Sequence, residues 1–491
     1  MEDAGKHKNE IEVRTAKLAD MRSAGMNPYK DRYELNHSLS DLSLLPDGTA
    51  NIRIAGRVVS IRNFGKLTFI HLFDHSGTVQ VALQKNDIGD AYDLFKKFVD
   101  TGDYIGVEGT AFTSKAGEKT VNALSWELLS KALRPLPEKF HGLADTEQRL
   151  RKRYLDLISS PEAMDCFKRR TAIIKTIRSY LDSNNFLEIE TPVLMNKASG
   201  AMATPFQTHH NALDIDVYLR IAPETYLKRA IAGGFDRVYE FARCFRNEGM
   251  DPSHLPDFTM LEYYCSYWNY EDNMNFTEKL IKHVLLEVNK SLEIEYGGAK
   301  ISFNGAWPRI PFRDLILKDC GIDISKVLTR DDILGELERL KIALDAPKGL
   351  ENCGLGTIID LLYKKVSRPL ITNPVFVTRH PVELSPLARR SDRDGKTADR
   401  FQLVVNGWEI VNAYSELVDP VDQAARFEEQ LKARERGDTE TMEVDRDFLL
   451  CMEYGMPPMS GWGMGIDRFV ALLTGAPSLR ETVLFPLMRP E

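Results

Sequence analysis

The chain has 491 residues, of which 64 are lysine or arginine and 72 are aspartate or glutamate, and its formal net charge is −8. A hydrophobic share of 43% and a charged share of 28% are ordinary for globular proteins and exclude a disordered or fibrous chain. At roughly 100–200 residues per domain, the length predicts several domains. The negative charge argues against a protein that coats nucleic acid through bulk charge, although it leaves room for a local basic groove.

The six cysteines lie far apart, without a Cys-x-x-Cys pair or a neighbouring histidine cluster. This spacing disfavours a zinc site or a disulfide framework and favours a reducing compartment. The first residues, MEDAGKHKNEIEVR, are too charged for a signal peptide. No apolar run approaches the ~20 residues that span a bilayer. We therefore expect a cytoplasmic protein with no membrane partner.

The pattern of the first part of the sequence predicts a helical extension followed by a small barrel. The extension is residues 1–50, and its charged, weakly amphipathic stretch from 9 to about 24 is expected to be a solvated helix that packs on a larger body. Residues 51–135 alternate apolar and polar residues in short segments, with one helical stretch after the third segment. This order is typical of an OB-type barrel, a fold often used on single-stranded nucleic acid.

A second, larger domain is predicted at 161–491, after a proline-containing, basic linker at 136–160. It opens with an amphipathic helix, because Ile173 and Ile177 follow helical spacing, and it continues with the strand-like FLEIETPVL. Residues 313–370 are mostly helical in pattern. They are expected to be an insertion, because strand texture resumes at NPVFVTRHPVEL.

The first candidate site lies on two predicted strands, 238–248 and 258–265, joined by the turn-like GMDPSHLPD. Burying an unpaired carboxylate costs several kcal/mol, so Glu262 must face a cation or water. The alternative is that Glu262 simply pairs with Arg243 or Arg246 across the hairpin. Because a strand alternates its faces, the residues on the side of Glu262 are Phe258, Met260 and Tyr264.

The second candidate site is RFQLVVNGWEIVNAYSEL, in which Asn406-Gly407 predicts a two-residue hairpin turn. The resulting register puts Gln402 and Glu409 on one face. A further set of polar residues on the second strand shares one pocket with them only if a bulge occurs near Ile410–Val411. This set is Asn412, Tyr414 and Glu416. The alternative is an edge strand with a polar outer face.

The third candidate site is GWGMGIDRFVALL, where Gly461, Gly463 and Gly465 precede a helix with an apolar stripe. Glycines before a helix allow the backbone to approach a phosphate or a base, although the spacing is not the G-x-G-x-x-G fingerprint. The alternative is a turn that serves packing alone. Arg468 falls in the first helical turn, where a cation opposes the helix dipole, so another interaction must favour it.

Taken together, the three segments resemble the signature motifs of the class II aminoacyl-tRNA synthetases. FLEIETPVL resembles motif 1, CFRNE with the downstream HLPDF resembles motif 2, and GWGMGIDRF resembles motif 3. With the barrel ahead of them, the chain is similar to the lysyl/aspartyl/asparaginyl subgroup, and APETYLKRAIAGG, PVELSPLARR and NAYSEL are similar to its lysyl members. The resemblance runs from about Arg14 to Arg489. It implies an α+β protein with an OB-fold barrel, an antiparallel catalytic sheet flanked by helices, and a homodimer interface around Pro192.

The chemistry of that family implies a role for each kind of residue. The lysine carboxylate attacks the α-phosphate of ATP, and the 3′-terminal adenosine of tRNA then accepts the lysyl group. Such steps need positioning and charge neutralisation more than a strong base. The resemblance implies that Arg246 bridges the carboxylate and the α-phosphate, that Arg468 covers adenine and touches the γ-phosphate, and that Glu409 binds Mg²⁺. Further ATP-binding residues implied are Glu248, His254 and Phe258.

The amino-acid pocket implied by the resemblance is acidic, as a lysine ammonium group requires. An aspartate pocket would need arginine or lysine, and none stands at the matching positions. The residues implied are Glu224, Tyr264 and Glu416 around the side-chain ammonium, Glu262 and the Gly200 backbone near the α-amino group, Asn412 near the carboxylate, and Tyr414 along the aliphatic stem.

In the barrel, Arg62, Phe69 and Gln80 match family positions that read the tRNA anticodon. A phenylalanine ring stacks on a splayed-out base, and the polar side chains form hydrogen bonds with the edge of that base. The alternative is that Phe69 belongs to the barrel core.

Three positions depart from the family pattern. Gln402 replaces a second Mg²⁺-binding glutamate, and a neutral amide binds the ion more weakly, so we expect a less tightly held or water-mediated Mg²⁺. Asp257 replaces a glutamate, and Ala201 replaces a glycine. Two other functions are considered: a paralogue that lysylates a protein, although such relatives lack the barrel, and a tRNA-binding protein that has lost catalysis. Retention of Arg246 and Arg468 argues against the second.

Overall fold

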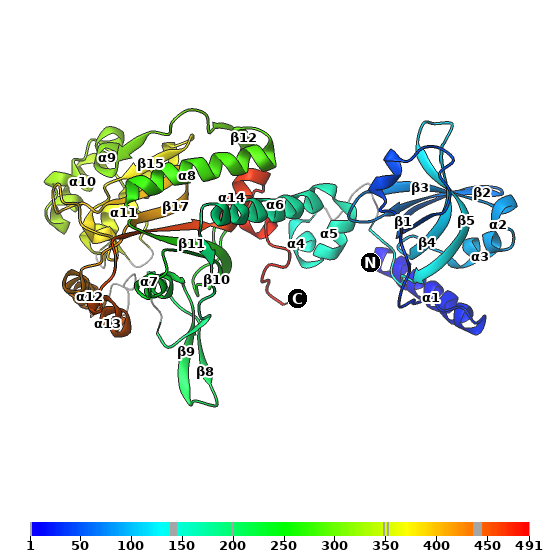
Figure 1. Cartoon of the computed structure of the whole chain (residues 1–491), viewed down its shortest axis with the longest axis horizontal. Coiled ribbons are helices and arrows are strands. Elements are labelled where there is room, and N and C mark those ends of the chain that lie inside the picture. Colours follow the sequence, from blue (N-terminus) through cyan, green and yellow to red (C-terminus); the bar gives the residue numbers. More distant parts are fainter. Residues whose placement is uncertain are drawn as a thin grey trace. The chain divides into compact units, whose positions relative to one another are not determined.

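The chain divides into two compact units, Met1–Met164 and Asp165–Glu491 (Figure 1). No helix within the residues described is long and apolar enough to cross a membrane. The computed structural model describes residues 2–137, 145–197, 200–201, 203–346, 349–350, 353–435 and 444–490. Part of the predicted linker, 138–144, lies outside these ranges, as do 347–348 and 351–352 of the predicted insertion.

The first unit contains a closed five-stranded barrel with strand order β1-β2-β3-β5-β4. Its apolar interior is formed by residues such as Ile54, Ile70 and Val107, which are fully buried. Helices α2 and α3 follow the third strand, which confirms the predicted OB-type barrel. The strands are β1 (Ile52–Phe64), β2 (Leu67–Phe73), β3 (Thr78–Gln84), β4 (Tyr104–Thr113) and β5 (Lys119–Ser130), and the helices are α2 (Lys85–Ile88) and α3 (Ala91–Phe98).

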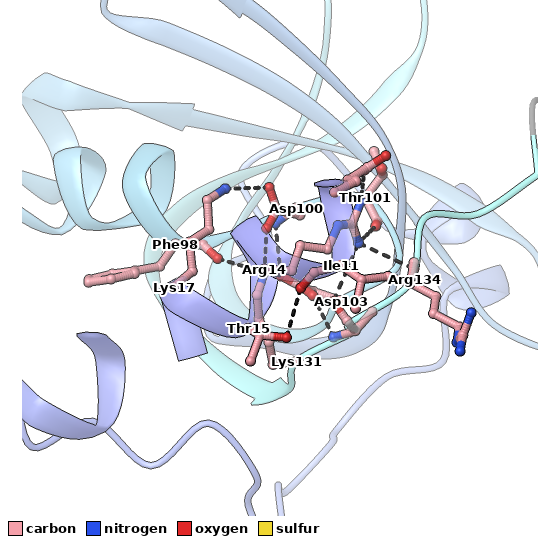
Figure 2. Close-up of polar contacts among 12 residues, drawn as sticks. Ile11, Arg14, Thr15, Lys17, Phe98, Asp100, Thr101, Asp103, Lys131 and Arg134 are labelled. Carbon is pink, nitrogen blue, oxygen red and sulfur yellow. Dashed lines mark hydrogen bonds and ion pairs between the residues drawn. The ribbon is translucent and has the colours of Figure 1, made fainter. Parts of the chain in front are cut away.

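Helix α1 (Glu2–Ser23) packs on the barrel through buried charges, as Figure 2 shows. Arg14 is 3% exposed and donates to the carbonyl oxygen of Thr101 at 2.8 Å. Lys131 Nζ lies 2.5 Å from an Asp100 carboxylate oxygen and 2.8 Å from an Asp103 oxygen. Buried ions of this kind are tolerated because each has a partner. The predicted N-terminal helix is therefore confirmed.

The second unit is built on an eight-stranded sheet with strand order β14-β15-β16-β17-β18-β11-β10-β6. The sheet is antiparallel except at its two ends, where β14 and β15, and β10 and β6, run parallel. The strands are β6 (Leu187–Glu188), β10 (Arg237–Phe245), β11 (Asp257–Ser266), β14 (Arg309–Pro311), β15 (Val375–Thr378), β16 (Arg400–Val405), β17 (Trp408–Ser415) and β18 (Met459–Gly465).

One face of this sheet is covered by helices α6 (Pro161–Ser183), α8 (Tyr270–Val284) and α14 (Ile466–Thr474) (Figure 1). Their apolar stripes bury Ile177, Leu280 and Phe469 against strand residues that include Leu261 and Val411. Because strands alternate their faces, the neighbouring strand residues point to the opposite face, where the candidate site lies. The predicted amphipathic helix around Ile177 is confirmed.

Smaller elements flank the sheet. A three-stranded sheet has order β7-β9-β8, a hairpin joins β12 and β13, and the predicted helical insertion forms α9 to α11 between β14 and β15, with its own apolar core. The remaining elements are α4 (Thr146–Arg151), α5 (Arg153–Ser159), β7 (Leu194–Met195), β8 (Gln207–His210), β9 (Ile215–Leu219), α7 (Glu224–Ala232), β12 (Glu293–Tyr296), β13 (Ala299–Ser302), α9 (Phe312–Cys320), α10 (Arg330–Leu340), α11 (Leu355–Val366), α12 (Pro420–Glu435) and α13 (Arg446–Glu453).

Two local predictions were wrong. FLEIETPVL is not a continuous strand, because only Leu187–Glu188 and Leu194–Met195 are extended and paired; Pro192 between them has no N–H to give to a ladder. The glycines before α14 do not form a turn. They lie on β18, a central strand paired with β11 and β17.

Candidate active site

A cavity of about 330 Å³ opens on the face of the large sheet opposite α6, α8 and α14. Its walls come from β11, β17 and β18, from the turn between β10 and β11, from the segment around Gly200, and from the starts of α7 and α14. Gln402 and Glu416 lie behind this wall, and both are buried. The predicted site residues that line the cavity are Gly200, Glu224, Arg246, Glu248, His254, Phe258, Glu262, Tyr264, Glu409, Asn412, Tyr414 and Arg468.

The alternation of β11 brings its polar residues into the cavity as predicted. Phe258, Met260, Glu262 and Tyr264 all line it. The alternative pairing of Glu262 with an arginine across the hairpin is wrong, because the residue opposite Glu262 on β10 is Glu240, and Glu262 Oε2 instead accepts a hydrogen bond from Tyr264 Oη at 3.1 Å. Glu262 is therefore left facing the cavity.

The β16–β17 hairpin has the predicted turn and the predicted bulge. Asn406 and Gly407 adopt φ values of 48° and 72°, as a tight two-residue turn requires. Val404 pairs with Glu409 but the preceding Leu403 pairs with Val411, so Ile410 is the extra residue. The bulge turns the downstream polar residues of β17 to the face of Glu409, and the edge-strand alternative is wrong.

The glycines of β18 make room for side chains of the neighbouring strands. A Cβ atom at Gly461 would lie 2.1 Å from Glu416 Oε1 and 2.4 Å from Tyr264 Cε1, which no side chain tolerates. At Gly463 the nearest atom would be Glu262 Cγ at 3.6 Å, an ordinary contact. Gly461 therefore has a steric requirement that sequence analysis did not identify.

Two arginines supply positive charge to one part of the cavity. The Arg246 guanidinium lies 5.0 Å from the centre of the Phe258 ring, a cation–π distance. Arg468 lies in the first turn of α14, where its guanidinium contacts Glu409 O at 3.3 Å and His254 Nε2 at 3.1 Å. Burial lowers the pKa of Arg468, and the positive charges of Arg368 and Arg246 add to this effect. An anion in the cavity would therefore relieve an unfavourable arrangement of cations.

The turn between β10 and β11 carries two further predicted residues. Glu248 Oε1 accepts a hydrogen bond from the Thr204 N–H at 3.1 Å, and His254 Nδ1 lies 2.8 Å from Asp251 Oδ2. Both residues line the cavity and are exposed to solvent.

The other part of the cavity is acidic and contains one residue that sequence analysis missed. Tyr414 Oη donates to Glu224 Oε1 at 2.6 Å. Lys228 Nζ lies 2.6 Å from the same oxygen and also pairs with Glu416 Oε2. The available signal was the i,i+4 spacing of Glu224 and Lys228 on α7.

Burial dominates the electrostatics of this acidic cluster. It raises the pKa of Glu416 to about 8, against the opposing effect of Lys228 and with a further rise from Glu224. It also raises the pKa of Glu262 well above its usual range, and the negative charge of Glu224 adds to this rise. A cationic ligand would stabilise the ionised carboxylates.

The predicted metal position is built from Gln402 and Glu409. Gln402 Nε2 donates to Glu409 Oε2 at 2.9 Å, and the Gln402 side chain also lies against the buried His380, whose pKa it raises against the effect of burial. Among all the residues that the structure describes, no three His, Cys, Asp or Glu side chains converge as a metal cluster. One carboxylate and one amide oxygen are donors of the kind that Mg²⁺ accepts, so these residues fit a weakly bound ion.

The predicted anticodon residues lie on the outer face of the barrel. Arg62 on β1 is opposite Phe69 on β2, and His71 on β2 is opposite Gln80 on β3. Phe69 is half-buried between the fully buried Thr68 and Ile70, so the alternative that it belongs to the barrel core is wrong. Sequence analysis missed Glu118, which accepts a hydrogen bond from Gln80 Nε2 at 2.6 Å.

The predicted dimer residue Pro192 is exposed. Apolar neighbours are exposed with it: Leu187 is 51% exposed, Val193 40% and Leu194 49%. This patch lies at the β6 edge of the large sheet and at β7.

The comparisons with known proteins agree with this geometry. Residues 145–489 match the model of class II tRNA synthetases (D, K and N), and residues 52–129 match that of an OB-fold nucleic acid binding domain. The chain is 45% identical to the lysine–tRNA ligase of Pelotomaculum thermopropionicum, covering 98% of the chain and 95% of the relative, and 46% identical to that of Carboxydothermus hydrogenoformans, covering 98% of each. The chain therefore belongs to the lysine–tRNA ligase family of class II tRNA synthetases.

Proposed function

We propose that the chain ligates L-lysine to tRNA in an ATP-dependent reaction that passes through a lysyl-adenylate. The charge layout of the cavity carries this proposal. Arg246 and Arg468 line one part, whereas Glu224 and Glu262 line another and Glu416 lies behind them. Cationic groups suit the phosphates of ATP, and carboxylates suit the two ammonium groups of free lysine.

In the first step, a lysine carboxylate oxygen attacks the α-phosphorus of ATP. The bond from phosphorus to the bridging oxygen breaks, and pyrophosphate leaves with that electron pair. No proton has to move, so the site has to hold the reactants in line and neutralise charge. Arg246 bridges the carboxylate and the α-phosphate, Phe258 and Arg468 enclose the adenine, and Glu248 and His254 hold the nucleotide at the cavity mouth.

The acidic part of the cavity selects the amino acid. Glu262 and the Gly200 backbone receive the α-ammonium group, and Asn412 assists at the carboxylate. The residues around the side chain are Glu224, Tyr264 and Glu416 at its ammonium group and Tyr414 along its aliphatic stem. Pairing every charge of the substrate offsets the cost of removing it from water.

Mg²⁺ is the metal ion of the proposed reaction, and Glu409 with Gln402 Oε1 would hold it. The ion supplies charge neutralisation at phosphate oxygens. Glu409 also keeps Arg468 in place through its backbone oxygen, so the two residues serve the same phosphate region.

The barrel is proposed to bind the tRNA anticodon through Arg62, Phe69 and Gln80. An exposed cation, a half-buried ring and a polar amide on one outer face suit a splayed base. Because the six cysteines form no disulfide in the described structure, we also propose a cytoplasmic site of action.

A homodimer formed through the Pro192 segment is a further proposal. The exposed apolar side chains of Leu187, Val193 and Leu194 support it, since a contact between two copies would remove them from water. Sedimentation of Leu194→Asp tests it, with Leu370→Asp as a control at an exposed leucine of the insertion. We expect only the first to give a monomer, and a dimer in both variants would contradict this interface.

Aminoacylation tests the proposed function. Purified protein, ATP, Mg²⁺ and radiolabelled lysine are incubated with total tRNA, and acid-precipitable label is measured. We expect lysine to appear on tRNA as an alkali-labile ester. Lysine transferred to a protein acceptor instead would favour the paralogue, and adenylate formation without tRNA charging would contradict the proposal.

A further inference from the structure

Lys228 places a fixed ammonium group beside the proposed lysine pocket. The residue is 1% exposed, on the first turns of α7. Its Nζ pairs with Glu224 Oε1 at 2.6 Å and with Glu416 Oε2. These are two of the carboxylates that the proposed function assigns to the ammonium group of the substrate, so an internal lysine already occupies part of that receptor.

The surroundings of Lys228 are closed by aromatic rings. Its Nζ lies 5.9 Å from the centre of the Tyr264 ring, 5.6 Å from Tyr414 and 5.7 Å from Phe448. Tyr264 and Tyr414 also line the cavity, so the same rings border the substrate space on their other side. Aromatic faces stabilise a cation that has lost water, which keeps the ammonium in place.

Lys228 pairs with Glu416 through Oε2, and the backbone N–H of Gly461 donates to the same carboxylate. The other oxygen, Oε1, is buried. A Cβ atom on the cavity-lining Gly461 would lie 2.1 Å from it, so Oε1 faces the strip of β18 that has no side chain. A carboxylate oxygen can accept more than one hydrogen bond, and a ligand ammonium group is the further donor that this pocket is proposed to receive.

The charges of the pocket then match those of the substrate. Once the protons of Glu262 and Glu416 are released on binding of a cationic ligand, the three carboxylates of Glu224, Glu262 and Glu416 and the one ammonium of Lys228 carry two net negative charges. Free lysine carries two ammonium groups, and its carboxylate is assigned to Arg246. Without Lys228, the third negative charge would have no partner and would be relieved by protonation of a carboxylate.

We propose that Lys228 is a specificity-determining positioning residue, which cancels one of three pocket carboxylates so that the pocket matches the two ammonium groups of lysine. This inference rests on the proposed function, because it assigns a role within the same site. Lys228 itself does not touch the reacting atoms. It acts through Glu224 and Glu416, which it holds in place by ion pairs, and it lowers the pKa of Glu416 against the effect of burial.

The titrating groups around Lys228 set the expected pH dependence. They are Glu224 on α7, Glu262 and Tyr264 on β11, and Tyr414 and Glu416 on or beside β17. Lys228 opposes the rise in the pKa of Glu416 caused by burial. Removing its charge raises that pKa further, so the carboxylate stays protonated to higher pH. At a pH below the new pKa, each unit by which the pKa rises lowers the affinity for a cation by about tenfold.

The test uses charge-compensating variants of the full chain. Lysine-dependent ATP–pyrophosphate exchange is measured for wild type, Lys228→Met, Glu224→Gln and the double variant, with lysine binding followed by calorimetry between pH 6.5 and 9. We expect Lys228→Met to raise KM for lysine about tenfold or more at pH 7, with a much smaller change in KM for ATP. The loss should decrease as the pH rises.

The double variant gives the sharper result. Glu224→Gln alone leaves one net negative charge for two ammonium groups, whereas adding Lys228→Met restores two. We therefore expect the double variant to bind lysine more tightly than Glu224→Gln does. This comparison stands even if Lys228→Met alone does not fold. If the losses of the two single variants simply add, the double variant binds lysine more weakly than Glu224→Gln does. That result would overturn the inference.

Lys131→Met provides the matched control. Lys131 is likewise buried between two carboxylates, Asp100 and Asp103, but it lies in the barrel. Its loss should lower the melting temperature and leave KM for lysine in the exchange reaction unchanged. If Lys228→Met behaves in the same way, Lys228 is only structural. Absence of lysine-dependent exchange in wild type would instead reject the proposed function, and calorimetry would still compare the variants.

Discussion

The side-chain amide of Gln402 donates a hydrogen bond to the carboxylate of Glu409, with Nε2 and Oε2 2.9 Å apart. This contact holds the two side chains together at the proposed Mg²⁺ position. It also uses one oxygen of the only carboxylate that the proposal assigns to the ion.

The first prediction follows from this contact. Gln402→Glu adds a second carboxylate beside Glu409, and a divalent cation is the natural partner of two adjacent carboxylates. We expect half-maximal pyrophosphate exchange at a lower Mg²⁺ concentration, and tighter Mn²⁺ binding by electron paramagnetic resonance. An unchanged Mg²⁺ dependence together with unchanged Mn²⁺ binding would show that Gln402 is not near the ion.

The second prediction concerns Arg468. Its half-buried charge lies beside His254 and near Arg246, so its substitution by glutamine removes a cation that has been placed for an anion. We expect kcat/KM for ATP in the exchange reaction to fall by about 10²–10³-fold, as it does when other groups that stabilise transition-state charge are removed. Arg229→Gln is the control, because Arg229 pairs with Asp445 outside the cavity lining. Equal losses in both variants would contradict the assignment.

The third prediction concerns space on β18. Gly461→Ala forces a Cβ atom to within 2.1 Å of Glu416 Oε1, so Glu416 or Tyr264 must move out of the pocket. We expect a large rise in KM for lysine and a lower melting temperature. Gly463→Ala meets only an ordinary contact at 3.6 Å and should have the smaller effect on both quantities. The reverse order would contradict the packing described here.

The fourth prediction separates the barrel from the adenylate chemistry. Phe69→Ala removes the half-buried ring on the outer face of the barrel, and stacking on such a ring contributes about 1–3 kcal/mol per base. We expect a higher KM for tRNA in charging and an unchanged rate of pyrophosphate exchange. Leu124→Ala, at an exposed leucine of β5, is the control. Unchanged charging by Phe69→Ala would exclude an anticodon role for this ring.

Much of the site could be predicted from the sequence because its strands carry local signals. Asn406-Gly407 defined the hairpin, and the requirement that one pocket hold both polar sets located the bulge that the structure has at Ile410. The period of β11 likewise placed Glu262 and Tyr264 on one face. These are properties of short segments, and short segments keep them in the fold.

The remainder depended on contacts between distant segments. The glycines around Gly463 read locally as a turn, but β11 and β17 on both sides make them a central strand. The pairing of Lys228 with Glu416 joins α7 to the end of β17, and no local pattern indicates it. The pairing of β6 with β10 likewise joins segments that are distant in the sequence.

Lysine-dependent ATP–pyrophosphate exchange over a Mg²⁺ series, with aspartate and asparagine as the control amino acids, tests the account most directly. The charge layout of the cavity predicts exchange with lysine alone, because Glu224, Glu262 and Glu416 provide no partner for an additional substrate carboxylate. Exchange with aspartate, or no exchange with lysine at any Mg²⁺ concentration, would contradict the assignment of this cavity to lysine activation.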